Sequence, residues 1–112
     1  MADYREIVTG TIVHKSSGAP VAGATVEVYD KDLLINDHLG TTTTDEAGRF
    51  RVAFGWADYK DAFLEDRPDI FLKVSDPASG ETLKTGVYAE LKGEMIDDDT
   101  EVMDLGQIEL GA

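Results

Sequence analysis

The chain contains no cysteine, so disulfide bonds and thiolate chemistry are both excluded. Basic residues are scarce, ten against 23 acidic ones, and the net charge of −13 disfavours binding to nucleic acid or anionic lipid. No apolar run approaches the roughly 20 residues that span a bilayer, and the charged N-terminus shows no signal peptide. We therefore expect no nucleic-acid partner, no membrane insertion, and a location in the cytoplasm or export by a leaderless route.

A chain of 112 residues with a hydrophobic fraction of 42% is expected to fold as one domain, residues 1–112. Short segments of alternating apolar and polar side chains, separated by turns rich in Gly, Pro and Asp, predict strands. The predicted strands cover residues 5–15, 24–29, 41–44, 49–54, 70–75, 82–89 and 105–110. A short helix is predicted near residues 58–65, and the polar segment 91–100 is predicted to be an exposed loop. The pattern predicts an all-β fold, a seven-stranded antiparallel β-sandwich with one short helix.

Two tight turns support this prediction. Ser16 to Pro20 is expected to end the first strand, because Gly and Pro interrupt the alternation there. Asp45 to Gly48 is expected to close a bulged β-hairpin between the strands 41–44 and 49–54, with Gly48 in the left-handed position.

Four segments together resemble a known group of sandwiches. They are Gly10–Val13, Gly18–Val28, Thr44–Phe50 and Asp104–Leu110. Their layout is similar to the transthyretin-like and carboxypeptidase-regulatory-like (prealbumin-like) β-sandwiches, and it covers most of the chain. The architecture hosts many roles, so the resemblance implies a fold more than a function.

Three chemistries known in this group are not matched by the residues present. Hydroxyisourate hydrolases use a Tyr-Arg-Gly-Ser tail, whereas this sequence ends Leu110-Gly111-Ala112, so that activity is not expected. Intradiol dioxygenases have iron-binding histidines after an Arg-Pro pair, but Arg67-Pro68 is followed here by Asp69-Ile70-Phe71. Pilin-type relatives need an asparagine near the last strand, and the one asparagine is Asn36.

An acidic loop is the main candidate site. Asp30, Asp32, Asn36 and Asp37 fall within eight residues, a spacing similar to a calcium loop of synaptotagmin-type domains. Calcium takes six to eight oxygen ligands, and residues i and i+2 of an extended segment point the same way. Asp76 follows the alternating residues Ile70, Leu72 and Val74, just as Asp30 follows Val26 and Val28, so it could join them. The alternative is that Asp30 and Asp32 cap turns, and that Asn36 and Asp37 close a loop through bonds from side chain to backbone.

The leading hypothesis from the sequence is a non-enzymatic binding or interaction module with calcium as its candidate cofactor and no catalytic residues. One alternative is a small hydrolase of the hydroxyisourate-hydrolase type on the same scaffold, without the tail of that family and using His14 with a neighbouring acid. The other is a carbohydrate-binding module, or a protein interface such as a homodimer, built on outward-facing aromatic rings. The candidate rings are those of Tyr29, Trp56, Tyr59, Phe63 and Phe71. Against this, the predicted helix could cover the same face and bury them.

Overall fold

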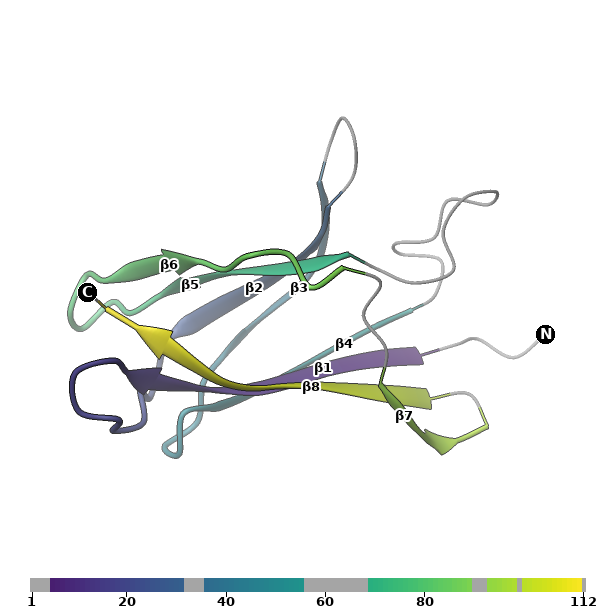
Figure 1. The fold of residues 1–112 in the computed structure, drawn as a ribbon, viewed down its shortest axis with the longest axis horizontal. Helices are drawn as coiled ribbons and strands as arrows, with labels where there is room; N and C mark the ends of the chain where they lie inside the picture. The colour runs from purple at the N-terminus through teal and green to yellow at the C-terminus, as the bar shows by residue number, and fades with distance from the viewer. Residues whose placement is uncertain (1–4, 32–35, 56–68, 90–92, 99, 112) are drawn as a thin grey trace.

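The computed structural model of the chain describes residues 5–31, 36–55, 69–89, 93–98 and 100–111. Within these ranges it contains eight strands in two four-stranded sheets that face each other (Figure 1). The first sheet has the order β4-β1-β8-β7, formed by Arg49–Gly55, Arg5–His14, Thr100–Leu110 and Glu94–Asp97. The second has the order β3-β2-β5-β6, formed by Asp37–Thr43, Thr25–Asp30, Ile70–Ser75 and Thr82–Lys84. The β-sandwich expected from the sequence is confirmed.

The core lies between the sheets and follows from the alternation of side chains along each strand. In β4, Phe50, Val52 and Phe54 are buried while the residues between them are exposed. In β2, Val26 and Val28 are fully buried and alternate with half-buried polar positions. Burying such a side chain stabilises the fold by roughly 1.5–3 kcal/mol relative to leaving it in water. The other side of β2 is thereby left to form an outer face.

Several details of the predicted sandwich are wrong. The described residues form eight strands rather than the seven predicted, and β1 pairs with β8 in parallel, so the first sheet is not wholly antiparallel. The predicted loop 91–100 contains β7, which alternation could not reveal because all four of its residues are exposed. The strand predicted over 82–89 is limited to Thr82–Lys84, and the last strand begins at Thr100.

The predicted helix at 58–65 lies outside the described residues, and no helix occurs within them. Nor do these residues form a helix long and apolar enough to cross a membrane.

The turn from Asp45 to Gly48 joins the two sheets. A hairpin within one sheet was expected, but β3 belongs to the second sheet and β4 to the first. The turn itself is as predicted: Gly48 donates its amide to the Asp45 carbonyl at 2.9 Å and has a φ of 78°. A Cβ on Gly48 would lie 2.5 Å from the Ile12 carbonyl oxygen. Glycine is therefore required here both by the backbone angle and by the close approach of β1.

Candidate functional site

Polar, charged and aromatic side chains gather on the outer face of the second sheet. On β2, Glu27 and Tyr29 face outward because Val26, Val28 and Asp30 face the core. The strand register sets their neighbours. Glu27 pairs with Lys73 and Tyr29 with Phe71 on β5, Tyr29 pairs with His38 on β3, and Lys73 pairs with Lys84 on β6.

A bulge in β3 is what brings His38 to this face. Val28 pairs with Gly40, yet the next residue of β2, Tyr29, pairs with His38, so Leu39 is the extra residue. Without this irregularity Tyr29 would lie opposite Leu39. With it, Leu39 is buried and His38 is exposed on the outer face. Bulges re-aim side chains in this way and are over-represented beside active sites.

Three rings form a row across the middle of the face. Tyr29 stacks on Phe71 with centroids 5.2 Å apart and planes 10° apart. The imidazole of His38 meets Tyr29 edge-on at 5.2 Å and 61°. On the ring of His38, Nε2 lies 2.7 Å from the hydroxyl of Thr41. The row thus ends in an imidazole held within hydrogen-bond distance of a hydroxyl group.

Tyr29 is also tied to the charged residues. Its hydroxyl donates a hydrogen bond of 2.7 Å to Oε2 of Glu27. This bond is the main cause that raises the pKa of Tyr29, with desolvation and the negative charge of Glu27 adding to it. The phenol is therefore a firmly protonated donor that keeps one oxygen of Glu27 occupied.

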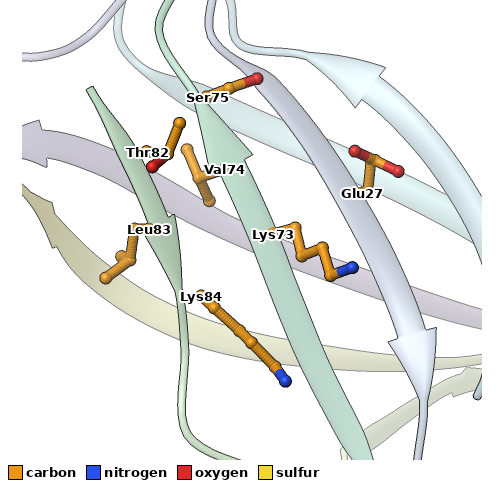
Figure 2. A pocket seen from close by; sticks show the side chains of 7 residues that line it. All are labelled: Glu27, Lys73, Val74, Ser75, Thr82, Leu83 and Lys84. Atoms are coloured by element: carbon orange, nitrogen blue, oxygen red, sulfur yellow. The ribbon is translucent and has the colours of Figure 1, made fainter. Parts of the chain in front are cut away.

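Two lysines lie over the rings. Nζ of Lys73 is 5.0 Å from the centre of Tyr29, and Nζ of Lys84 is 5.1 Å from the centre of Phe71. Their stems border an open pocket of about 280 Å³ (Figure 2). Its lining comprises Glu27, Lys73, Val74, Ser75, Thr82, Leu83 and Lys84. Ligand pockets usually measure about 300–1,000 Å³, and this one lies just below that range, so it has room only for a small molecule. Sequence analysis missed it because the lining comes from three strands whose pairing the sequence does not show.

The structure describes three of the four residues of the predicted calcium loop, Asp30, Asn36 and Asp37. Asp30 is 4% exposed, faces the core, and accepts a hydrogen bond of 3.0 Å from the amide of Asp69. Asp37 is its cross-strand neighbour and begins β3, and the exposed Asn36 precedes it. Asp32 lies outside the described residues. Within the described ranges, no three His, Cys, Asp or Glu side chains are grouped so that they could hold a metal ion. Calcium binding therefore stays a prediction.

The predicted fifth ligand, Asp76, lies elsewhere. Asp76 follows Ser75, the last residue of β5, whereas the residue that pairs with Asp30 is Ile70, the first residue of β5. Since six residues of a strand span about 17 Å, Asp76 cannot lean toward the loop. Its carboxylate accepts hydrogen bonds of 3.0 Å from the amide of Ala78 and the hydroxyl of Ser79. Asp76 thus caps a turn.

The histidine chosen for the hydrolase alternative is not organised for catalysis. His14 ends β1, on the first sheet, and only its backbone makes hydrogen bonds among the described residues, to Ala19 and Gly18. A general base works within hydrogen-bond reach of the group it activates, and is normally oriented by a third group. Of the two histidines, His38 is the better placed, since its ring meets Tyr29 and lies within hydrogen-bond distance of Thr41.

The aromatic strip is only partly as predicted. Tyr29 and Phe71 do lie on the outward faces of their strands, but Phe71 is 2% exposed and offers no ring face to a sugar. Tyr29 is half-buried. Trp56, Tyr59 and Phe63 lie outside the described residues. A homodimer and a carbohydrate partner stay predictions.

Comparison with known proteins establishes the fold. No protein-family model matches the chain, and no curated protein does. Several solved structures resemble it, of which three are described. A 9R-lipoxygenase from Cyanothece PCC8801 has a TM-score of 0.61 at 23% identity, over 94% of this chain. Chlorocatechol 1,2-dioxygenase from Pseudomonas putida has 0.61 at 19% identity, over 96%. The 5-hydroxyisourate hydrolase of Klebsiella pneumoniae has 0.53 at 17% identity, over 95%.

The chain spans 16% of the lipoxygenase, 61% of the dioxygenase and 92% of the hydrolase. All three are enzymes, which overturns the expectation that this sandwich marks a non-enzymatic module. At these identities the likeness shows the fold alone. The chemistry of this chain must therefore be argued from its own side chains.

Proposed function

We propose that this chain is a hydrolase of small molecules, built on a transthyretin-like β-sandwich, with its site on the outer face of the second sheet. One observation carries the proposal. An imidazole and an ammonium group reach the same ring, that of Tyr29, from the two strands that flank β2. The centroid of His38 is 5.2 Å from the ring centre and Nζ of Lys73 is 5.0 Å from it. A small molecule over Tyr29 would contact both groups.

The two groups suit the two halves of a hydrolytic step. His38 takes a proton from water as the water oxygen attacks the carbonyl carbon of an amide or ester. The carbonyl oxygen gains the negative charge, which faces the ammonium group of Lys73. When the oxygen re-forms its double bond to the carbon, the bond to the leaving group breaks. The imidazolium then gives its proton to the departing nitrogen or oxygen. Thr41 holds the imidazole through its hydroxyl.

The size of the scaffold is compatible with this activity. The hydrolase from K. pneumoniae is matched over 92% of its length, so a sandwich of nearly this length can carry hydrolytic chemistry without a further domain. The proposal does not take over the substrate of that protein. The proposed substrates are amides or esters of small molecules, and the pocket of about 280 Å³ that adjoins this site is lined by Lys73 and Glu27 but by neither Tyr29 nor His38.

The test compares the two histidines, because the chain has no others. Purified protein is assayed against chromogenic esters and anilides of small acids, together with His38→Gln and His14→Gln. We expect His38→Gln to lose at least about a hundredfold in kcat, the usual worth of a general base, and His14→Gln to match the natural chain. Hydrolysis that survives in His38→Gln, or no hydrolysis above the buffer rate, would reject the proposal.

A further inference from the structure

Lys73 and Lys84 form a cross-strand pair of like charges. They are directly opposite each other on β5 and β6, and their side chains extend along the outer face in the same direction (Figure 2). Directly opposed residues have Cβ atoms about 4.5–5.5 Å apart, and like charges so placed destabilise a sheet. Such an arrangement needs an explanation in a chain that has 23 acidic residues available for pairing.

In the part of the chain that the structure describes, neither lysine forms an ion pair with a carboxylate. Neither ammonium group has an oxygen of Asp or Glu within 4 Å there. Glu27, the other cross-strand neighbour of Lys73, accepts the hydroxyl of Tyr29 instead. Each lysine lies over an aromatic ring, 5.0 Å from Tyr29 and 5.1 Å from Phe71. Cation–π contacts hold the two stems in place without neutralising their charge.

We propose that the substrate carries a permanent negative charge, a carboxylate or a phosphate group, and that Lys84 binds it. This inference rests on the proposed function, since it names the substrate class of the same site. The division of roles follows from position. Lys73 shares Tyr29 with His38 and so faces the bond to be broken, whereas Lys84 lies over Phe71, one strand farther from His38.

The spacing of the rings sets the shape of the substrate. Tyr29 and Phe71 are 5.2 Å apart, close to the spacing of neighbouring strands. The anionic group therefore lies about 5 Å from the scissile carbonyl, a separation of a few bonds. Half-amides and half-esters of short dicarboxylic acids have this form, and so do short acyl compounds with a phosphate at the other end.

The experiment uses the anionic 4-nitroanilide of succinic acid and the uncharged 4-nitroanilide of butanoic acid, which has a methyl group in place of the carboxylate. Binding of each to the natural chain is followed by backbone-amide NMR, and hydrolysis by the release of nitroaniline. The same measurements are made on Lys84→Met, Lys84→Gln, His38→Gln and Lys15→Met. Lys15 is exposed on another part of the surface, so Lys15→Met removes the same charge without touching the site. Inorganic phosphate, titrated alone, distinguishes a phosphate group from a carboxylate.

We expect the succinyl compound to bind at least about tenfold more tightly than the butanoyl one, with shifts centred on β5 and β6. Both Lys84 variants should abolish this preference by raising KM with little change in kcat, and Lys15→Met should keep it. Equal binding of the two compounds, or equal losses in Lys84→Met and Lys15→Met, would overturn the inference.

The two proposals fail separately. Charge-selective binding that needs Lys84, without turnover, supports this inference and rejects the hydrolase. Turnover that needs His38 but ignores the charge of the substrate supports the hydrolase and rejects this inference.

Discussion

Tyr29 and Glu27 lie two positions apart on β2 and are joined by a hydrogen bond of 2.7 Å from the phenol to the carboxylate. Residues i and i+2 of a strand share a face, so both side chains stand on the outer side of the second sheet. The bond gives Glu27 a partner on its own strand, although Lys73 is its direct neighbour across the strands. It thereby leaves the charge of Lys73 available beside the ring of Tyr29.

The replacement Glu27→Gln should lower the pKa of Tyr29 toward its ordinary value of about 10, since it removes both the charge and the carboxylate acceptor. The titration can be followed at the ring carbons of Tyr29 by NMR. Glu109→Gln, an exposed change on β8 of the first sheet, is the matched control and should leave the pKa of Tyr29 unchanged. An unaltered pKa in Glu27→Gln would contradict the hydrogen bond.

The same bond predicts the sign of a pH dependence of stability. A group whose pKa is raised by folding contributes stability that is complete below its unfolded pKa and is lost as pH rises through the folded pKa. For Tyr29 the contribution should therefore be present at neutral pH and disappear above about pH 10. The free energy of unfolding of the natural chain minus that of Tyr29→Phe, measured in urea at several pH values, should fall over this range. A difference that is constant or rises with pH would be inconsistent with it.

Gly48→Ala should destabilise the chain by about 2 kcal/mol or more, because the turn needs a positive φ and the added methyl group meets the Ile12 carbonyl. Gly18→Ala is the matched control, since Gly18 has a φ of 75° but no atom within 4 Å of an added Cβ. Gly18→Ala should lower the free energy of unfolding only by the strain of an alanine at positive φ, about 1 kcal/mol. Urea unfolding measures both. Equal losses in the two variants would mean that the contact with β1 is unimportant.

The calcium prediction can be tested by melting experiments. If the acidic loop binds calcium, millimolar Ca²⁺ should raise Tm more than the same concentration of Mg²⁺. At a hundredfold excess over Kd, bound calcium adds about 2.7 kcal/mol to the free energy of unfolding. Asp37→Asn should reduce the shift, whereas Asp76→Asn should not, because Asp76 lies at the other end of the sheet. Equal shifts with both ions would remove calcium from consideration.

Much of the fold could be read from local pattern. Alternation in Arg49–Gly55 and Thr25–Asp30 identified strands and their buried sides, because a half-buried strand must place every second side chain in the core. The strand β7 was missed because it buries neither side, so no alternation of buried and exposed residues marks it. The parallel pairing of β1 with β8 also escaped prediction, because the direction of a distant partner leaves no periodic signal in either strand.

The candidate site was less accessible to sequence reasoning. Outward parity correctly placed Tyr29 and Phe71 on the surface of a sheet. However, the sequence shows His38 as one more residue of an acidic loop, and Lys73 and Lys84 as two isolated charges. The bulge between β2 and β3 places His38 beside Tyr29, and the register of β5 with β6 places Lys84 beside Lys73. Asp30 and Asp76, which share a parity, prove to lie far apart because parity specifies a side of the sheet and not a position along it.

The sequence by itself determined which side of each strand is buried, where Gly48 must turn, and how strongly negative the surface is. The tertiary structure alone decided that an imidazole, a phenol and two ammonium groups share one face. The physical reason is that burial preference belongs to each residue and its immediate neighbours in the chain, while register depends on hydrogen bonds between segments that meet only after folding.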